Sequence, residues 1–333
     1  MKEQIRWGIM GTGWIAERFS TALNALKEEG AVLYAVGSRT QETADAFSER
    51  FGFEKAYGSY EDLVSDPAVD VVYVATPHRF HFENAMLCLE HGKAVLCEKA
   101  FTVNAAEART IAQKAAEKQV FVMEAFWTRF QPLNRRLHRL VCEDGLIGDI
   151  RMMQIDFDKI EDWPDTHRIY NPQLAGGTIL DLGIYTMSYA AYFLGAEPEH
   201  IHGECTIGKG GVDDQCAMLL KYPGGALCLQ TAALQTEGRR EALILGTKGQ
   251  ICVPQFSKAT RCTWTDYASG TVTDIDEGDF LCNGYEYEAM EVMDCLRNGR
   301  LQSSIMPLDE TVRLMELLDE WRAQCSFRYP FED

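Results

Sequence analysis

Residues 5–16 read IRWGIMGTGWIA, and this stretch decides the fold of the first half of the chain. A short apolar strand leads directly into Gly11 and Gly13, and Ala16 follows shortly after them. In such a turn the first glycine permits the tight bend, the second lets a pyrophosphate approach the backbone, and the alanine lets the next helix pack closely. The free N–H groups at the start of that helix attract phosphate. The residues predicted to contact a dinucleotide here are Gly11, Gly13, Trp14 and Ile15.

The residues around this glycine pattern distinguish a dinucleotide site from an ordinary glycine turn. Alone, the pattern is weak, because a glycine turn in another α/β fold would look the same. Here it follows an apolar strand and precedes a predicted helix at residues 14–25 and a predicted strand at residues 31–36. A dinucleotide site needs this strand–helix–strand unit, so the context favours dinucleotide binding.

The composition of the 333-residue chain limits its partners. Apolar residues make up 46%, enough for a full core, and the net charge is −18. A chain this acidic is a poor partner for nucleic acid or an anionic membrane surface. No apolar run reaches the length of a membrane span, and no signal-peptide core follows residues 1–6. We therefore expect a cytoplasmic protein that binds neither nucleic acid nor membrane.

Cysteine is frequent, with eleven residues in the chain. The number is odd and no C-x-x-C pair occurs, which disfavours both a disulfide framework and a metal site. We predict reduced core thiols, since most lie in apolar surroundings. Examples are Cys88, Cys97, Cys216 and Cys228.

The end of the second predicted strand indicates the type of dinucleotide. Roughly 20 residues after the glycines, an NAD site has an acid for the ribose hydroxyls, whereas an NADP site has arginine and hydroxyl groups for the 2′-phosphate. No acid appears here before Glu42. The alternative is an arginine on an ordinary surface loop, but the missing acid favours NADP over NAD. The residues predicted to bind the phosphate are Ser38, Arg39 and Thr40.

A second group of polar residues follows the predicted strand at residues 69–75, VDVVYVA. Its continuous β-branched run is typical of a parallel strand buried on both faces, and ligand contacts in such sheets come from the loops at the carboxyl ends of strands. An H-x-x-H pair follows and invites a zinc site, but no acidic or thiol partner stands at ligand spacing. We therefore expect no metal and a cofactor-edge or capping role. The residues concerned are Thr76, Pro77, His78 and His81.

Glu98 and Lys99 follow the next predicted strand, at residues 94–97. A lysine becomes useful in proton handling when partial burial or a neighbouring positive charge lowers its pKa. The alternative is a solvated lysine at the end of a strand, and the residues alone leave both interpretations open.

The alternation of strands and helices stops near residue 125, which we take as the domain boundary. We predict a Rossmann dinucleotide-binding domain at residues 1–125 and a substrate-binding and dimerisation domain at residues 126–333. In the second part, polar and apolar residues alternate, which is typical of an open, mostly antiparallel sheet with one buried face. The predicted strands are residues 149–158, 199–207, 217–222, 226–232, 241–245, 250–253 and 262–265. The predicted fold class is α/β, a doubly wound parallel sheet followed by an α/β domain with this large sheet.

Asp181 and Tyr185 are four residues apart and share one face of a helix if that helix begins early enough. A phenol can deliver a proton while a carboxylate and a lysine tune and position it. The alternative is a helix-capping aspartate and a core tyrosine, which the residues alone slightly favour.

Six stretches together resemble the glucose–fructose oxidoreductase, inositol dehydrogenase and rhizopine-catabolism (Gfo/Idh/MocA) family, over nearly the whole chain. The resemblance is nearest to the branch of dimeric dihydrodiol dehydrogenase and NADP-linked D-xylose 1-dehydrogenase. The stretches are GIMGTGWIA (8–16), ATPHRFHFENA (75–85), GKAVLCEKA (92–100), MEAFWTRFQP (123–132), RIYNPQLAGGTILDLGIY (168–185) and MPLDETVRLMELLD (306–319).

The resemblance implies roles for residues in these stretches. Lys99 matches the catalytic lysine of the family, Asp181 the acid that assists it, and Tyr185 the proton donor or acceptor of the sugar- and diol-oxidising branch. Trp127 and Arg129 belong to a segment that borders the nicotinamide and the substrate. The open sheet of the family often mediates dimers, so the resemblance also implies a homodimer.

Two positions depart from the family pattern. Ala100 stands where the family has proline after the lysine, and that Lys–Pro bond is often cis. A cis bond before alanine costs about 3 kcal/mol more than trans, so we expect a trans bond, or a strained cis bond, and a re-aimed Lys99. Ala175 stands where the branch usually has a third glycine.

The predicted function is an NADP-dependent oxidoreductase that moves a hydride between nicotinamide and a secondary alcohol or hemiacetal carbon. Its substrate is expected to be a sugar, another polyol or a trans-dihydrodiol, with Trp127 and Phe157 available to stack on its ring. One alternative is a non-catalytic dinucleotide-binding regulator of sugar metabolism, which would be free to lose Lys99, Asp181 or Tyr185. Another is a reductase of a different ring system such as a tetrapyrrole.

Overall fold

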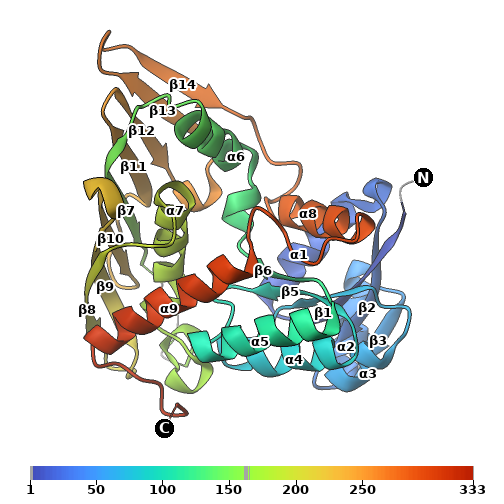
Figure 1. The fold of residues 1–333 in the computed structure, drawn as a ribbon. Coiled ribbons are helices and arrows are strands. Elements are labelled where there is room, and N and C mark those ends of the chain that lie inside the picture. Colours follow the sequence, from blue (N-terminus) through green and yellow to red (C-terminus); the bar gives the residue numbers. More distant parts are fainter. Residues whose placement is uncertain (1–2, 161–163, 165, 333) are drawn as a thin grey trace. The chain divides into compact units, whose positions relative to one another are not determined.

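The computed structural model describes residues 3–160, 164 and 166–332 (Figure 1). It divides into two compact units, of which unit 1 comprises residues 1–127 and 280–312, and unit 2 comprises residues 128–279 and 313–333. Residues 280–312 thus belong to unit 1 although they follow the sheet of unit 2 in the chain. The assignment of substrate binding and dimerisation to residues 126–333 stays a prediction.

Unit 1 is built on a six-stranded parallel sheet in the order β3-β2-β1-β4-β5-β6. This is the doubly wound order, and it reverses between β1 and β4, where ligands bind in such sheets. The predicted parallel sheet is therefore confirmed. Its strands are β1 (Ile5–Met10), β2 (Ala31–Gly37), β3 (Lys55–Tyr57), β4 (Val71–Val74), β5 (Ala94–Glu98) and β6 (Val122–Ala125).

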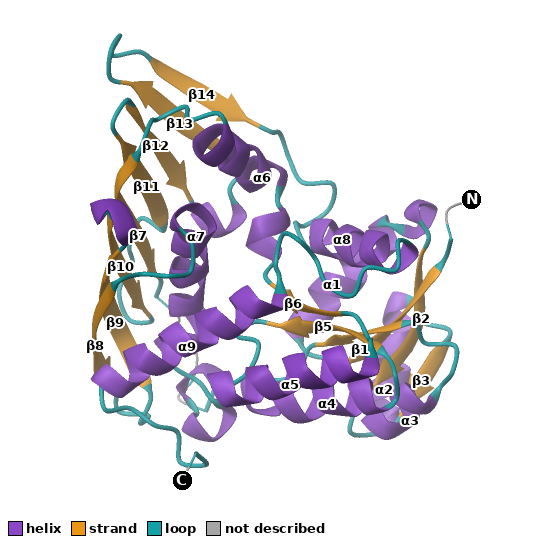
Figure 2. Ribbon diagram, in the orientation of Figure 1, coloured by secondary structure: helices purple, strands orange, loops and turns teal. Residues whose placement is uncertain are grey.

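Helices cover this sheet in two groups, α1 with α2 and α8, and α3 with α4 and α5 (Figure 2). The core beneath the first group is aromatic, since Phe19 stacks on Tyr73 with 3.8 Å between ring centroids and Trp7 packs edge-on against Phe19. The helices of unit 1 are α1 (Trp14–Ala25), α2 (Gln41–Phe51), α3 (Tyr60–Ser65), α4 (His81–Glu90), α5 (Ala105–Lys118) and α8 (Glu286–Arg297).

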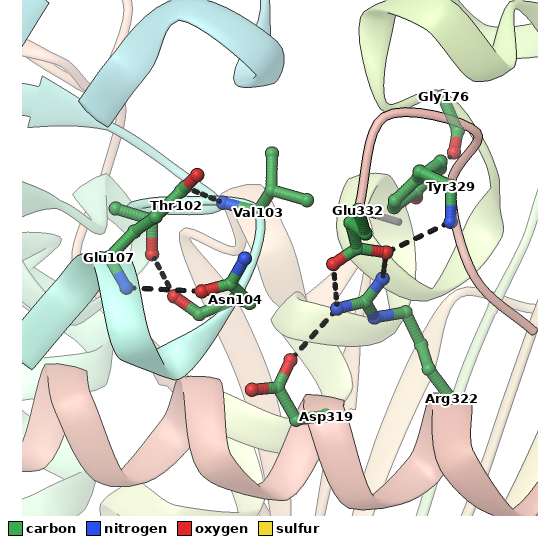
Figure 3. A network of polar contacts seen from close by, with 9 residues as sticks. All are labelled: Thr102, Val103, Asn104, Glu107, Gly176, Asp319, Arg322, Tyr329 and Glu332. Atoms are coloured by element: carbon green, nitrogen blue, oxygen red, sulfur yellow. Dashed lines mark hydrogen bonds and ion pairs between the residues drawn. The ribbon is translucent and has the colours of Figure 1, made fainter. Parts of the chain in front are cut away.

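Local capping explains where α5 begins (Figure 3). The Asn104 side chain accepts a hydrogen bond from the N–H of Glu107 at 3.0 Å, and the Glu107 carboxylate accepts one from the N–H of Val103 at 3.1 Å. Both N–H groups lie at the helix start, where no intrahelical partner exists, so these side chains define the first turn.

Unit 2 contains an eight-stranded sheet in the order β14-β13-β12-β11-β7-β10-β9-β8. Only β7 and β10 pair in parallel, so the predicted mostly antiparallel sheet is confirmed. The edge strand β14 and the short β3 of unit 1 were not predicted. The strands are β7 (Ile150–Asp158), β8 (His200–Ile207), β9 (Asp213–Lys221), β10 (Leu227–Ala233), β11 (Glu241–Gly246), β12 (Gly249–Pro254), β13 (Arg261–Asp266) and β14 (Val272–Asp276).

The two faces of this sheet differ in composition. Helix α7 (Ile184–Leu194) packs on β7 and β10, over buried side chains such as Met153 and Cys228. On the opposite face, Leu219 and Leu229 stay 40% and 44% exposed. The alternation predicted from the sequence therefore gives one buried face, as expected. The other helices are α6 (Pro132–His138) and α9 (Leu308–Gln324), which begins in unit 1 and continues into unit 2.

The cysteines contribute to these cores as unpaired thiols. Burial of the four predicted core thiols is confirmed for Cys88, Cys97, Cys216 and Cys228. Within the part of the chain that the structure describes, no cluster of three or more His, Cys, Asp or Glu could hold a metal ion. In the same residues, no helix has both the length and the apolarity to cross a membrane.

Candidate functional site

The glycine turn after β1 leaves room for a phosphate. Gly11 has φ +110°, and a Cβ there would lie 3.1 Å from the carbonyl oxygen of Ala75, so glycine is required. Gly13 precedes α1 without a side-chain cap, and a Cβ built on it meets nothing within 4 Å. Trp14 is 67% exposed and Ile15 is half-buried, whereas Ala16 is buried beneath the helix. The uncapped helix start and the open space at Gly13 fit a dinucleotide pyrophosphate.

The end of β2 presents the predicted phosphate group. The backbone N–H of Ser38 donates to the carbonyl of Tyr57 at 3.0 Å, and its side chain is buried. Arg39 is exposed, and its positive charge opposes the rise that burial causes in the pKa of Tyr60. Thr40 caps α2 by accepting from the N–H of Thr43 at 3.3 Å. Arg39 is therefore the accessible cation of this segment.

His81 joins the loops that follow β4 and β5. Its imidazole is fully buried, with Nε2 2.7 Å from the carbonyl oxygen of Thr76 and Nδ1 2.9 Å from that of Ala100. The Thr76 hydroxyl also accepts a hydrogen bond from Asn84 at 3.0 Å. The imidazole thus bridges two loops rather than capping a helix, and a cofactor-edge role for the His pair stays a prediction. Pro77 is half-buried, and the buried His78 packs edge-on against His81 at 5.6 Å.

Glu98 and Lys99 lie at the carboxyl end of β5. The buried Glu98 carboxylate accepts hydrogen bonds from the Tyr73 hydroxyl and, at 3.1 Å, from the N–H of Lys99. Lys99 itself is half-buried. The Lys99–Ala100 bond is cis, which is one of the two forms that the sequence left open.

Glu288 is a buried acid that the sequence analysis missed. It lies on α8 with no exposed surface, and neither carboxyl oxygen has a hydrogen-bond partner among the residues described. Burial raises its pKa well above the ordinary value, and the charges of Glu98 and Glu286 raise it further. Its place among the apolar residues Ala289, Val292 and Met293 of α8 is the signal that could have identified it.

Trp127 ends unit 1 in a packed position. Its ring stacks on Tyr285, with centroids 4.4 Å apart and planes inclined by 15°. Gly284 lies directly against this indole, since a Cβ there would come within 2.8 Å of it. The loop before α8 thus holds Trp127, which retains 9% exposure.

Arg129 is buried inside unit 2 at 2% exposure. Its Nε donates to the Ser188 hydroxyl at 2.9 Å, one terminal nitrogen donates to the Ser188 carbonyl at 3.0 Å, and the guanidinium lies over the Tyr192 ring. These contacts anchor α7 to the segment after β6. A substrate-bordering role for Arg129 stays a prediction.

Asp181 and Tyr185 lie together at the start of α7. Asp181 belongs to a π-helical turn, Ile179–Gly183, and Tyr185 is the second residue of α7 itself. Both terminal nitrogens of Arg168 donate to one Asp181 oxygen at 3.2 Å. The Tyr185 ring packs edge-on against Phe157 with centroids 5.2 Å apart, and it is 8% exposed.

The three predicted proton-handling residues are divided between the units. Lys99 lies in unit 1, whereas Asp181 and Tyr185 lie in unit 2. Within unit 2 the partner of Asp181 is Arg168, a residue that the sequence analysis quoted but gave no role. Arg168 lies thirteen positions before Asp181, a separation that matches neither helix nor strand periodicity. The pair is therefore visible only in the folded loop.

Two family models match the chain. A model described as "Oxidoreductase family, NAD-binding Rossmann fold" covers residues 5–126, and the "GFO/IDH/MocA C-terminal domain" covers residues 135–252. The trans-1,2-dihydrobenzene-1,2-diol dehydrogenase of Mus musculus is 38% identical over 98% of both chains. The D-xylose 1-dehydrogenase (NADP(+)) of Hypocrea jecorina is 35% identical over 98% of this chain and 93% of the relative. The chain belongs to the Gfo/Idh/MocA oxidoreductase family.

Solved structures agree with this membership. A levoglucosan dehydrogenase in complex with NADH and levoglucosan matches with a TM-score of 0.89 at 19% identity, over 97% of this chain and 98% of the other. KijD10, a 3-ketoreductase from Actinomadura kijaniata in complex with NADP and TDP-benzene, matches with a TM-score of 0.86 at 25% identity over the same shares.

Membership in the Gfo/Idh/MocA family confirms the resemblance, including its branch, and the fold class. The protein is an NAD(P)-dependent dehydrogenase that acts on CH–OH groups.

Proposed function

We propose that the protein is an NADP-dependent oxidoreductase that transfers a hydride between nicotinamide and a secondary alcohol or hemiacetal carbon of a sugar or trans-dihydrodiol. The observation that supports this most is the pair at the start of α7, where Tyr185 stands beside an Asp181 held by Arg168. The relatives named for a trans-dihydrodiol and for D-xylose support the substrate class.

In this proposal the residues of the chain transfer the proton, and the nicotinamide of bound NADP would serve as the hydride acceptor. Tyr185 takes the proton of the substrate hydroxyl in the oxidation direction. Lys99 stabilises the phenolate and the developing oxyanion, and Asp181 helps to hold Lys99. Trp127, Arg129 and Phe157 border the substrate ring.

The preference for NADP rests on the end of β2. Arg39 is exposed there, and Ser38 and Thr40 flank it. No acid occupies the position that would bind the ribose hydroxyls of NAD. We assign the 2′-phosphate to Arg39 because a guanidinium pairs with phosphate through two parallel hydrogen bonds. The predicted contacts of the remaining dinucleotide are Gly11, Gly13, Trp14, Ile15, Thr76, Pro77, His78, His81, Glu98 and Lys99.

A direct experiment is to follow nicotinamide absorbance with NADP and with NAD against pentoses, hexoses and cyclic trans-diols. The wild type should turn over at least one of these with NADP. Tyr185→Phe should lower kcat by at least about 100-fold, with little change in NADPH affinity. Tyr222→Phe is the matched control, because that hydroxyl has no hydrogen-bond partner within the described part of the chain. Equal turnover of wild type and Tyr185→Phe would contradict the role of Tyr185.

A non-catalytic regulator is the alternative that this experiment separates. Tight NADPH binding without turnover of any substrate in the panel would favour it. Retention of Lys99, Asp181 and Tyr185 supports the enzyme, because a regulator has no need of all three.

We also infer that the protein is a homodimer joined through the outer face of the unit 2 sheet. One row of residues crosses this face in register from β8 to β13, and three leucines stand in its middle, on either side of Gln154. The row is His202, Leu219, Leu229, Gln154, Leu243, Cys252 and Thr263. A second copy of the chain would cover these exposed apolar side chains. A cytoplasmic location stays a prediction from composition.

A further inference from the structure

The segment that leads into α7 is held by an aspartate on a neighbouring strand. Asp213 is the first residue of β9 and has no exposed surface. Its Oδ2 accepts a hydrogen bond from the N–H of Ile179 at 2.5 Å, and its carbonyl oxygen accepts one from the Thr178 hydroxyl at 3.0 Å. Ile179 opens the turn that contains Asp181, so this carboxyl contacts the backbone immediately before the proposed proton-handling residues.

Two glycines show how closely the chain is shaped around Asp213. Gly177 has φ +110°, and a Cβ there would lie 2.1 Å from Asp213 Oδ1. A Cβ on Gly176 would lie 2.5 Å from the carbonyl oxygen of Arg168, the partner of Asp181. The N–H of Asp181 in turn donates to the carbonyl of Gly177 at 3.3 Å. Asp213 therefore fixes the position of Gly177, and Gly177 in turn fixes the position of Asp181.

The C-terminal tail supports the same loop from outside (Figure 3). The Tyr329 hydroxyl donates to the carbonyl of Gly176 at 2.7 Å. Tyr329 is itself held by Glu332, whose carboxylate accepts from the Tyr329 N–H at 2.9 Å and pairs with Arg322 at 2.7 Å. Tyr329 and Arg322 are buried and the network lies within unit 2, so the tail fixes the turn at Gly176 to α9.

The Asp213 carboxyl is incompletely satisfied where it lies. Its Oδ1 is buried and has no hydrogen-bond partner among the described residues. Burial raises its pKa to about 7, while the backbone N–H of Ile179 and the charge of Arg322 act in the opposite direction. The titratable groups that face it are Arg322 and Cys325 of α9 with the turn after it, Tyr329 of the tail, Cys205 of β8 and Cys216 of its own strand. The thiols and the phenol have raised pKa values, which leaves Arg322 as the charged neighbour.

We propose that Asp213 is a positioning residue for the reaction, which holds the start of the α7 segment and thereby sets the place of Asp181 and Tyr185. This role rests on the proposed function of Tyr185. Ionised Asp213 makes a charge-assisted bond to Ile179, and the positive end of the helix favours that charge. Gain or loss of the proton changes the bond to Ile179, so turnover depends on pH through the neutral range.

The test compares Asp213→Asn with Asp214→Asn in the full-length protein. Asparagine keeps the shape and an accepting oxygen but cannot ionise. Asp214 is the next residue on the same strand and is half-buried, with its carboxylate bonded to Gln235 at 2.8 Å. We expect Asp213→Asn to lower kcat by about 10-fold or more with an unchanged KM for NADP, and to lose the neutral inflection of the kcat–pH profile. Asp214→Asn should keep the wild-type kcat and the neutral inflection of the kcat–pH profile.

Hydrogen exchange provides a measurement that does not depend on turnover. After correction for the intrinsic rate, protection of the peptide that contains Ile179 should decrease in wild type between about pH 6 and pH 8, because the raised pKa of Asp213 means that the closed segment binds the proton more tightly than an opened one. It should stay flat in Asp213→Asn. At the upper end the two proteins should differ by about 5-fold or more. If no substrate is turned over, the proposed function fails, while this exchange result still decides the role of Asp213.

A second variant covers the case in which Asp213→Asn does not fold. Tyr329→Phe removes only the hydroxyl bonded to Gly176, and we expect it to lower kcat while leaving the KM for NADP and the neutral inflection in place. A folded Asp213→Asn with wild-type kcat, pH profile and exchange overturns the proposal. So does a wild-type kcat in Tyr329→Phe if that is the only variant that folds.

Discussion

Asp181 accepts hydrogen bonds from both terminal nitrogens of Arg168, each at 3.2 Å, through a single carboxylate oxygen. The acid side chain is only 9% exposed, whereas the arginine is 41% exposed and reaches it from the preceding loop. The pair therefore fixes the orientation of the Asp181 carboxylate at the turn before α7.

Replacement of Arg168 by methionine tests this pair. Loss of the guanidinium removes two hydrogen bonds that orient Asp181, so we expect kcat to fall roughly 10-fold while NADPH binding changes little. Arg168→Lys keeps the positive charge but cannot donate from two terminal nitrogens, so its kcat should lie between those of wild type and Arg168→Met. Arg151→Met, an exposed arginine on β7, is the control. A wild-type kcat in Arg168→Met would show that the pair is dispensable.

The two glycines of the first turn should respond differently to alanine. At Gly13 the new methyl meets open space in the protein, so thermal stability should be unchanged while the NADPH Kd increases about 10-fold or more. At Gly11 the positive φ and the nearby Ala75 carbonyl should destabilise the fold by about 1–2 kcal/mol. Melting curves and fluorescence titration with NADPH measure the two effects. Unaltered NADPH affinity in Gly13→Ala would count against the pyrophosphate site.

Replacement of Arg39 by alanine tests the choice of cofactor. If Arg39 binds the 2′-phosphate, its loss should weaken NADPH binding by about 10- to 100-fold, which corresponds to a charge-assisted bond of roughly 1.5–3 kcal/mol. NADH affinity should hardly change, so the ratio of the two dissociation constants is the decisive quantity. Arg50→Ala is the control, since that arginine pairs with Glu17 at 2.6 Å. An equal effect on both cofactors would remove Arg39 from the phosphate site.

Glu288 should make stability depend on pH. Its pKa is raised in the folded protein above the ordinary 4.5, so the unfolded chain loses the proton first as pH increases. Its effect is therefore absent below about pH 4.5, and above that value it lowers the free energy of unfolding by about 1.4 kcal/mol per pH unit until the folded pKa is reached.

Glu288→Gln removes this titration while keeping the shape of the side chain. The difference in the free energy of unfolding between variant and wild type should therefore shift in favour of the variant as pH increases from about 5 to 8. Urea unfolding at a series of pH values measures it. Glu286→Gln is a poor control, because its carboxylate accepts from three backbone N–H groups before α8. Glu90→Gln, exposed at the end of α4, serves instead, and parallel pH curves for Glu288→Gln and wild type would show that Glu288 does not titrate as inferred.

The oligomeric state tests the outer face of the unit 2 sheet. Leu229 pairs with Leu219 across β9 and β10, and a charge in the middle of this row would be buried in a dimer. We expect Leu229→Glu to sediment as a monomer at concentrations where wild type is a dimer. Leu301→Glu, at a residue 41% exposed in unit 1, should leave the dimer intact. A monomeric wild type would refute the dimer directly.

Local sequence determined much of this protein. The glycine turn, the buried parallel strands and helix α1 follow from short-range patterns, because steric freedom and side-chain periodicity act within a few residues. The alternation in unit 2 likewise determined that its sheet has one buried face. The short strand β3 and the edge strand β14 escaped prediction, since their stability comes from pairing with a neighbour rather than from their own composition.

Only the tertiary structure decided which distant residues meet. Residues 280–312 return to unit 1 and bring Glu288 close enough to Glu98 to raise its pKa, and Arg168 reaches Asp181 through a folded loop. Asp213 meets Ile179 across thirty-four positions, with no motif to mark Asp213. The physical reason is that burial and charge pairing depend on positions in space, which a linear pattern records only where neighbours in the chain remain neighbours in the fold.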